Sequence, residues 1–350
     1  MKNRVKQSVL ALAAYTPGEQ PTEPGIVKLN TNENPYPPSP RVEQALRKLQ
    51  AERLRLYPDP VSTELRQTIA ALHGCGMDSV FAGNGSDEIL ALSTRAFVED
   101  AGSIGYFVPS YSLYPVLTDI RCVEKRPVDL GADFEWRMPK GYGCSLFFLA
   151  NPNAPTGILY PFPMVRDFCA ALDGVALIDE AYVDFSREHC LRLALELPNV
   201  LVMRTLSKSY SLAGLRVGYA VGRPDLVGAL FKVKDSYNLD RISQGLAVAA
   251  LSDPAHMRAN ADRIRATRGR LSAALEAFGY KVFPSETNFI WARPSGMSAA
   301  EVFEALRKRR ILVRHFPGGR TGDCLRITIG TDEEIDRLIE ALGGLGVGKR

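Results

Sequence analysis

A single lysine stands in an unusual environment near the middle of the chain. Lys208 follows the apolar run Val200–Met203 and has Thr205, Ser207 and Ser209 as its nearest polar neighbours. Burial beside an apolar strand disfavours the ammonium form, and an uncharged amine can attack a carbonyl to form a Schiff base. The alternative is an ordinary surface lysine after a strand, and these residues alone leave both interpretations open.

A carboxylate occupies a similar position at the end of another apolar run. Asp179 follows Val175–Ile178, and Tyr182 comes three residues later in the sequence Asp-Glu-Ala-Tyr. A carboxylate at the end of a buried strand needs a cationic partner to stay ionised. Asp179 is therefore a candidate partner for a positively charged group, with a helix cap as the structural alternative.

A glycine-rich turn, Gly83–Glu88, follows the apolar residues Val80–Ala82 and leads into a helical pattern. Small residues ahead of a helix leave backbone N–H groups available to an anion, and the helix dipole adds to the attraction. No Gly-Lys-Ser/Thr triplet follows, which argues against a nucleoside-triphosphate loop. A simple N-cap by Ser86 or Asp87 is the alternative interpretation.

Two arginines, Arg314 and Arg326, flank the short segment Thr321–Cys324. Arginine on a short strand is usually a surface residue. The planar guanidinium group is also the side chain best suited to bind a carboxylate or a phosphate. The pair is therefore a candidate for binding an anionic substrate.

Together these motifs resemble those of the class I and II aminotransferases, the fold-type I enzymes that use pyridoxal 5′-phosphate. The resemblance rests first on Thr-Leu-Ser-Lys followed by Gly-Leu-Arg-Val-Gly, and it covers nearly the whole chain in the correct order. It implies that Lys208 binds the cofactor as a Schiff base and moves the Cα proton of the substrate. It also implies that Asp179 pairs with the pyridine nitrogen and that Tyr182 bonds the phenolic oxygen. The implied ligands of the cofactor phosphate are Gly85, Ser86, Asp87, Thr205, Ser207 and Arg216.

The resemblance implies two further contacts with the cofactor ring. Tyr111 ends a strand, where a tyrosine usually belongs to the core, and the family places this aromatic flat against the pyridine ring. The turn at 151–157 resembles the Asn-Pro-Thr-Gly signature, whose asparagine donates to the phenolic oxygen. Ala154 stands immediately before Pro155, so we expect Asn153 to be the donor, with Asn151 as the second choice.

Further motifs accompany the arginine pair: Tyr-Thr-Pro-Gly from Tyr15, Asn-Glu-Asn-Pro from Asn32, Tyr-Pro-Asp from Tyr57 and Lys-Asp-Ser-Tyr-Asn from Lys234. Together they resemble the branch of this family that acts on histidinol phosphate. That resemblance implies that Arg314 and Arg326 hold the substrate phosphate and that Tyr15 and Asn32 line the substrate pocket. It also implies that Tyr57 reaches the cofactor phosphate of a neighbouring subunit, which requires a homodimer. The expected reaction exchanges an amino group between histidinol phosphate and 2-oxoglutarate, with glutamate as the amino product, in histidine biosynthesis.

Other activities fit the same motifs. An aromatic amino-acid aminotransferase or a threonine-phosphate decarboxylase would keep the scaffold and change the substrate. A regulator that binds the cofactor without turnover would normally need a DNA-binding module, and the residues before the first expected helix leave no room for one. These alternatives share most of the motifs and remain open at this point.

Composition favours a cytoplasmic protein with two domains. The chain has 350 residues and a net charge of +4, which is too weak over this length to indicate nucleic-acid binding. Its six cysteines show no spacing typical of a metal site or a disulfide framework. No run approaches the roughly 20 apolar residues of a membrane span, and the apolar run near the N-terminus is too short for a secretion signal.

The catalytic candidates fall where strands alternate with helices. Near-continuous apolar strands are expected over 80–82, 104–108, 146–150, 175–178 and 200–203. This pattern predicts an α/β fold with a mostly parallel central sheet covered by helices, which binds ligands at the carboxyl ends of its strands.

We expect helices over 42–54, 62–72 and 255–278, and further helices that begin at the capping boxes Ser298/Glu301 and Thr331/Glu334. The predicted division is an N-terminal segment (1–41) that joins a small α+β domain (255–350), with the large cofactor-binding domain between them (42–254).

Overall fold

The large sheet has seven strands, and the computed structural model describes residues 4–13 and 16–345 of the chain. The strands lie in the order β2 (Val80–Gly83), β8 (Gly218–Gly222), β7 (Val200–Thr205), β6 (Val175–Asp179), β5 (Leu146–Ala150), β3 (Ser103–Val108) and β4 (Glu124–Asp129). Strands β4, β3, β5, β6 and β7 run parallel, whereas β8 runs antiparallel to both of its neighbours. The prediction of a mostly parallel sheet is confirmed.

Both faces of this sheet are buried, which explains the continuous apolar runs in its strands. Along β5, Leu146 and Phe148 pack into one hydrophobic cluster, and Phe147 and Leu149 pack into the other. Successive side chains of a strand point to opposite faces, so a sheet covered on both sides needs apolar residues at every position. The helices that contribute buried side chains to the first cluster are α4 (Gly85–Phe97), α5 (Leu113–Arg121) and α8 (Pro224–Val233). Those that contribute to the second include α3 (Thr63–His73), α6 (Phe162–Ala171), α7 (Leu193–Glu196) and α9 (Arg241–Leu251).

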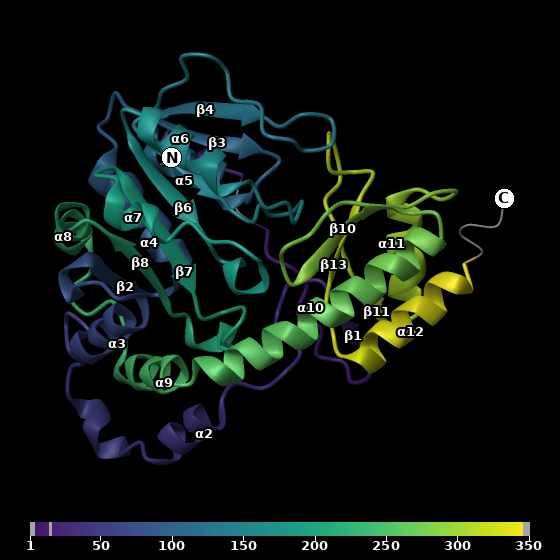
Figure 1. The fold of residues 1–350 in the computed structure, drawn as a ribbon, viewed down its shortest axis with the longest axis horizontal. Coiled ribbons are helices and arrows are strands. Elements are labelled where there is room, and N and C mark those ends of the chain that lie inside the picture. Colours follow the sequence, from purple (N-terminus) through teal and green to yellow (C-terminus); the bar gives the residue numbers. More distant parts are fainter. Residues whose placement is uncertain (1–3, 14–15, 346–350) are drawn as a thin grey trace.

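A second, smaller sheet is antiparallel and lies beside the first. Its order is β12 (Arg314–His315), β13 (Leu325–Thr328), β10 (Phe289–Arg293) and β9 (Lys281–Val282). The long helix α10 (Pro254–Ala277) runs from the large sheet toward this region, where α11 (Ala299–Lys308) and α12 (Asp332–Gly343) also lie (Figure 1). Both expected capping boxes are present at the starts of α11 and α12.

The N-terminal segment crosses between the two sheets. Strand β1 (Val27–Lys28) pairs in parallel with β11 (Ile311–Leu312) in a separate two-stranded sheet, so this segment is tied to the C-terminal region before the chain enters the large one. A short helix α1 (Gln7–Leu10) precedes it. The predicted division at residues 41 and 254 stays a prediction.

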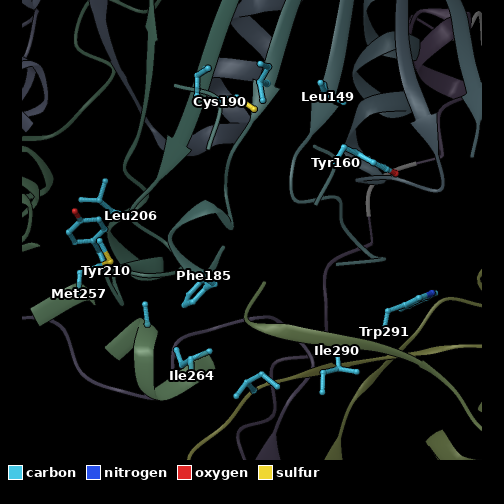
Figure 2. Packing of buried hydrophobic residues seen from close by; sticks show 14 of the residues in the cluster. Leu149, Tyr160, Phe185, Cys190, Leu206, Tyr210, Met257, Ile264, Ile290 and Trp291 are labelled. Atoms are coloured by element: carbon cyan, nitrogen blue, oxygen red, sulfur yellow. The ribbon is translucent and has the colours of Figure 1, made fainter. Parts of the chain in front are cut away.

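One hydrophobic cluster extends across both regions. Figure 2 shows it passing from Leu149 beneath the large sheet, through Phe185, to Met257 and Ile264 on α10 and then to Trp291 on β10. These buried side chains hold the two sheets in a fixed relation, and the cleft between them contains the site described below.

Three local predictions were incomplete. The helix expected over 42–54 is divided into α2 (Pro40–Arg47) and the 3₁₀ helix η1 (Ala51–Arg55). Strand β4 was missed because it is an edge strand whose side chains are exposed except at Val128. Strand β8 was missed because it begins and ends with glycine, a residue that is more typical of turns than of strands. Shorter 3₁₀ helices are η2 (Met77–Ser79), η3 (Val183–Phe185) and η4 (Ala213–Leu215).

Among the described residues, no helix is both long enough and apolar enough to cross a membrane. In the same part of the chain, no group of three or more histidine, cysteine, aspartate or glutamate side chains is arranged to hold a metal ion.

Candidate active site

A cavity of about 630 Å³ lies at the carboxyl ends of the parallel strands. The large sheet contributes the N-terminus of α4 and the segments that follow β3, β5, β6 and β7 to its wall. The rest of the wall comes from the N-terminal segment, residues 17–32, and from residues 314–326 of the smaller sheet and its connecting loop. The predicted residues that line it are Asn32, Ser86, Asp87, Tyr111, Asp179, Tyr182, Thr205, Ser207, Lys208, Arg216, Arg314 and Arg326. Residues from 32 to 326 therefore meet in one space, as expected for an open α/β sheet.

Lys208 reaches the cavity from the segment that follows β7. The residue is half-buried, with Nζ 3.5 Å from the Thr31 carbonyl oxygen and 5.7 Å from the centre of the Tyr182 ring. Its backbone is held in place because the Asn34 side-chain amide donates to the Lys208 carbonyl oxygen over 3.2 Å. The structure thus presents one primary amine to a bound molecule, as the Schiff-base hypothesis requires.

Asp179 ends β6 and is buried at the base of the cavity. Burial raises the pKa of its carboxyl group to about 6, although Tyr114 and the Ala181 backbone lower that pKa by donating hydrogen bonds. These donors lie 2.8 Å and 3.0 Å from the two carboxylate oxygens. A cation placed beside Asp179 would keep it ionised, so the site suits a protonated ring nitrogen. The next helical element, η3, begins at Val183, and Asp179 caps no helix.

Sequence reasoning missed Tyr114, which lies on the buried face of α5 and reads as a core residue. Its hydroxyl group donates to Asp179, and burial raises the pKa of that hydroxyl well above its usual value. A buried tyrosine usually needs a hydrogen-bond partner for its hydroxyl group. The expected burial of Tyr114 therefore predicts a partner for its hydroxyl group, but the sequence does not identify Asp179 as that partner.

The anion-binding end of the cavity depends on two glycines. Gly85 has φ +77°, and a Cβ atom there would lie 2.8 Å from the Arg216 guanidinium. A Cβ atom on Gly218 would lie 2.8 Å from the backbone of Gly85 and Ser86. Side chains at either position would obstruct the approach of β8 and Arg216 to the start of α4.

Hydroxyl and charged groups complete this end of the cavity. The Arg216 Nη1 atom donates to the Ser207 hydroxyl over 3.1 Å, and Thr205 and Ser207 are joined by a 3.0 Å hydrogen bond. Arg216 also lies 3.6 Å from the Asp87 carboxylate. A helix N-terminus, two hydroxyl groups and a guanidinium group together suit a phosphate.

Tyr111 lines the cavity and contacts two other functional candidates. Its hydroxyl donates to Asp87 over 3.2 Å, and its ring packs edge-on against Tyr114 at a centroid distance of 5.5 Å. The aromatic side chain is therefore held beside both the anion-binding end and the residue that donates to Asp179.

The structure gives both candidate asparagines hydrogen-bond partners within the protein, and the contact of Asn153 with the phenolic oxygen stays a prediction. The Asn153 amide donates to the Pro109 carbonyl oxygen and the Thr156 hydroxyl, and the Asn151 amide donates to the Tyr160 carbonyl oxygen. In the described part of the chain, neither asparagine lines the cavity. Both amides thus donate to other buried groups of the protein, and Ala154 lines the cavity at this point.

Asn32 was predicted to line the substrate pocket, and it also contacts Tyr182. Its side-chain amide donates to the Tyr182 hydroxyl over 2.9 Å. The backbone of Asn32 has φ 56°, a left-handed conformation that asparagine tolerates better than most residues. The pattern Asn-Glu-Asn-Pro gave no signal for this contact, because the two residues are 150 positions apart.

The two arginines belong to the part of the cavity wall that the smaller sheet forms. Arg314 on β12 and Arg326 on β13 are directly opposite each other in the antiparallel register, so both side chains project from the same face. Each guanidinium group lies 5.2 Å from the centre of the Phe316 ring. Arg314 donates to the carbonyl oxygens of residues 16 and 17, and Arg326 donates to that of residue 30. The N-terminal segment therefore lies against both arginines.

Two predicted residues are not part of this cavity. Tyr15 lies outside the described residues. Tyr57 is 76% exposed and stacks on Tyr237, with ring centroids 4.4 Å apart, and it does not line the cavity of its own chain. Its expected contact with the cofactor of a neighbouring subunit stays a prediction.

Comparison with known proteins is consistent with this geometry. The family model described as "Aminotransferase class I and II" matches residues 24–342. Histidinol-phosphate aminotransferase of Geobacter sp. strain M21 is 42% identical over 347 residues, which cover 99% of each chain. That of Chromohalobacter salexigens is 46% identical, with 96% of this chain and 97% of the relative covered.

A solved structure agrees with these relatives. The crystal structure of histidinol-phosphate aminotransferase from Sinorhizobium meliloti in complex with pyridoxal-5′-phosphate has a TM-score of 0.86 and 25% identity, with 99% of both chains covered. The arrangement of Lys208, Asp179 and Arg216 at the strand ends is thus found in a chain that matches this family over most of its length. The chain belongs to the class I and II aminotransferases.

Proposed function

We propose that this protein transfers an amino group between L-histidinol phosphate and 2-oxoglutarate, with pyridoxal 5′-phosphate as cofactor, in L-histidine biosynthesis. The observation that carries the proposal is a single cavity that is lined by Lys208 and Asp179 from the large sheet and by Arg314 and Arg326 from the smaller sheet. The names of the curated relatives, at 42% and 46% identity over nearly the whole chain, support the same substrate. They do not favour the aromatic aminotransferase or the decarboxylase.

The residues of the site fit pyridoxal 5′-phosphate. Its phosphate would be held by the start of α4, with Gly85, Ser86 and Asp87, and by Thr205, Ser207 and Arg216. Asp179 would accept from the protonated pyridine nitrogen, Tyr182 would donate to the phenolic oxygen, and Tyr111 would stack on the ring. When bound, the cofactor supplies an electron sink that makes the Cα proton of an amino substrate acidic.

The chain itself then positions the substrate and moves one proton. Lys208 would anchor the cofactor through its Nζ atom, and in its free amine form it would accept the proton from the substrate Cα and carry it during the transfer. Asp179 stays ionised beside the ring nitrogen, because a neighbouring cation offsets the burial that raises its pKa in the free protein. The buried hydrogen bond from Tyr114 holds the carboxylate in place.

The arginine pair explains a preference for substrates with an anionic end. Two guanidinium groups on neighbouring strands can bind the phosphate of histidinol phosphate through several charge-assisted hydrogen bonds. The distal carboxylate of 2-oxoglutarate offers the same kind of acceptor, so one subsite can serve both half-reactions. Asn32 and Tyr15 would contribute to the same substrate pocket.

We further propose that the protein is a homodimer located in the cytoplasm. The segment around η1 exposes a group of large apolar side chains, namely Leu46, Leu54, Leu56, Tyr57 and Val61. Such a patch on the surface is typical of a protein interface. A second subunit there would allow Tyr57 to reach the neighbouring cofactor phosphate, and sedimentation analysis would detect the dimer.

A substrate comparison tests the proposed activity. Protein reconstituted with pyridoxal 5′-phosphate should convert histidinol phosphate in the presence of 2-oxoglutarate far faster than it converts phenylalanine or phosphothreonine. A preference for phenylalanine, or release of carbon dioxide from phosphothreonine, would replace the proposed substrate and leave the cofactor chemistry unchanged. A protein that takes up no cofactor would remove the mechanism altogether.

A further inference from the structure

The wall of the cavity beside Tyr182 is poor in hydrogen-bond donors. The turn after β5 contributes Pro152, Ala154 and Pro155 to this wall, and none of these side chains can donate. The amides of both neighbouring asparagines, Asn151 and Asn153, donate to buried acceptors of the protein. The Tyr182 hydroxyl is therefore the donor on which this side of the cavity depends.

The orientation of the Asn32 amide follows from the neighbouring Thr328. The Thr328 hydroxyl accepts from the Asn32 backbone N–H over 3.0 Å, so its own hydrogen is available to donate to Asn32 Oδ1, 2.9 Å away. A hydroxyl group has one hydrogen, and this arrangement uses it. The Oδ1 atom thus faces Thr328, and the Nδ2 atom faces Tyr182.

This orientation determines the direction of the Tyr182 hydroxyl hydrogen. Because Asn32 Nδ2 donates to the hydroxyl oxygen over 2.9 Å, the hydroxyl hydrogen must point toward another acceptor. Among the described residues, the hydrogen-bond partner of this hydroxyl is the Asn32 amide, and Tyr182 lines the cavity. The hydrogen is therefore free to point into the cavity.

We propose that Asn32 is a positioning residue, which fixes the Tyr182 hydroxyl as a donor to the cofactor's phenolic oxygen in a site where Ala154 supplies none. Asn32 itself is buried and is held by three further hydrogen bonds: two with Thr328 and one from the Asn288 amide to its carbonyl oxygen. The bonds with Thr328, a residue of β13 in the smaller sheet, thus hold the Asn32 amide that donates to Tyr182. The inference rests on the proposed cofactor function.

The test follows the visible absorption of the bound cofactor as a function of pH. Asn32→Gly removes the amide and tolerates the positive φ, whereas Tyr182→Phe removes the hydroxyl. Loss of a donor leaves more negative charge on the phenolic oxygen, so the protonated chromophore is favoured. Each variant should raise the pH midpoint of the absorption change by about one unit.

The double variant Asn32→Gly/Tyr182→Phe distinguishes positioning from an independent effect. If Asn32 acts through Tyr182, the double variant should titrate like Tyr182→Phe alone. Asn260→Ala provides the matched control, because Asn260 is a buried asparagine that does not line the cavity and whose amide donates to the Pro37 carbonyl oxygen. Its midpoint should stay at the wild-type value.

Asn32→Asp provides a second variant if Asn32→Gly does not fold. It keeps the shape of the side chain, replaces the donor by an acceptor and should also raise the midpoint. An unchanged midpoint in a coloured Asn32 variant would overturn the inference, as would a shift in the double variant equal to the sum of the single shifts. A wild-type protein that binds no cofactor would instead overturn the proposed function.

Discussion

The large sheet forms one part of the cavity wall, and the smaller sheet and the N-terminal segment form the other. These two parts, called ends here, are built in different ways. The end that contains Gly85, Asp179 and Lys208 lies at the carboxyl ends of strands in one sheet, and each residue is placed by its own strand or by the helix that follows. The end that contains Arg314 and Arg326 depends on the N-terminal segment, whose contacts with this region span nearly 300 positions. Local structure therefore defines the chemistry, whereas long-range packing defines the space for the substrate.

This difference predicts separate effects of substitutions at the two ends. Changes beside Lys208 and Asp179 should reduce turnover of every substrate, because all substrates use the same reactive groups. Changes at the arginine pair should alter the ranking of substrates and leave the chemistry intact.

Replacing Lys208 with alanine should lower the amino-transfer rate by at least about 10⁴-fold, because both the anchor and the proton carrier are lost. Steady-state rates with histidinol phosphate and with phenylalanine should fall together. Lys125→Ala is the control, since Lys125 pairs with Asp119 in an exposed position. A Lys208→Ala protein that retains wild-type turnover would contradict the role of this residue.

The cofactor-free protein should show a pH-dependent stability that originates at Asp179. Its folded pKa of about 6 exceeds the ordinary value of 3.8 because the carboxyl is buried. The stabilisation is therefore fully present below pH 3.8 and is lost as the pH rises through about 6. Relative to Asp179→Asn, wild type should lose about 2 kcal/mol of unfolding free energy between about pH 4 and pH 7.

Urea unfolding at the two pH values measures this difference. Asp225→Asn replaces an exposed carboxylate at the start of α8 and should show no comparable change. Added pyridoxal 5′-phosphate should reverse the trend near pH 7, because its ring nitrogen supplies the missing cation. A constant difference between wild type and Asp179→Asn across the pH range would contradict the raised pKa.

At the opposite end, Arg314→Gln or Arg326→Gln should raise the KM for histidinol phosphate by about 10- to 100-fold, the loss expected for a charged hydrogen bond. The KM for phenylalanine should change little, because phenylalanine has no phosphate. Arg166→Gln, an exposed arginine paired with Asp167, is the matched control. An equal rise in the KM values of both substrates would show that the arginines support the fold and do not bind the phosphate.

The smallest effect is expected for a change at Ala154, which lines the cavity in the turn after β5. Ala154→Asn places an amide on the cavity wall near Tyr182 and adds a second donor for the phenolic oxygen. The pH midpoint of the cofactor absorption should fall by about half a unit. Ala181→Asn, which changes another residue of the cavity wall, serves as a comparison. A rise of the midpoint in Ala154→Asn would contradict the assignment of this wall to the phenolic oxygen.

The same contrast explains what could be predicted from the sequence. The strands that end at Asp179 and Lys208 are continuous apolar runs, so both the sheet and the position of the chemistry at its edge followed from local patterns. The capping boxes of α11 and α12 were equally local. The arginine pair was proposed by resemblance, and its register across β12 and β13 became visible only in the structure.

The missed features depend on tertiary contacts. Nothing near Asn153 in the sequence shows that its amide is used by the Pro109 carbonyl and Thr156. Tyr114 reads as a core residue until the fold brings its hydroxyl to Asp179. The bond from Asn32 to Tyr182 likewise joins two segments that only the complete fold brings together.

The proposed chemistry depends on a covalent bond between the Lys208 amine and the cofactor at the ends of these strands. Borohydride reduction of the reconstituted protein, followed by proteolysis and mass spectrometry, detects this bond. We expect a pyridoxyl group on the peptide that contains Lys208. A modified peptide that contains a different lysine, with Lys208 unmodified, would contradict the role of Lys208.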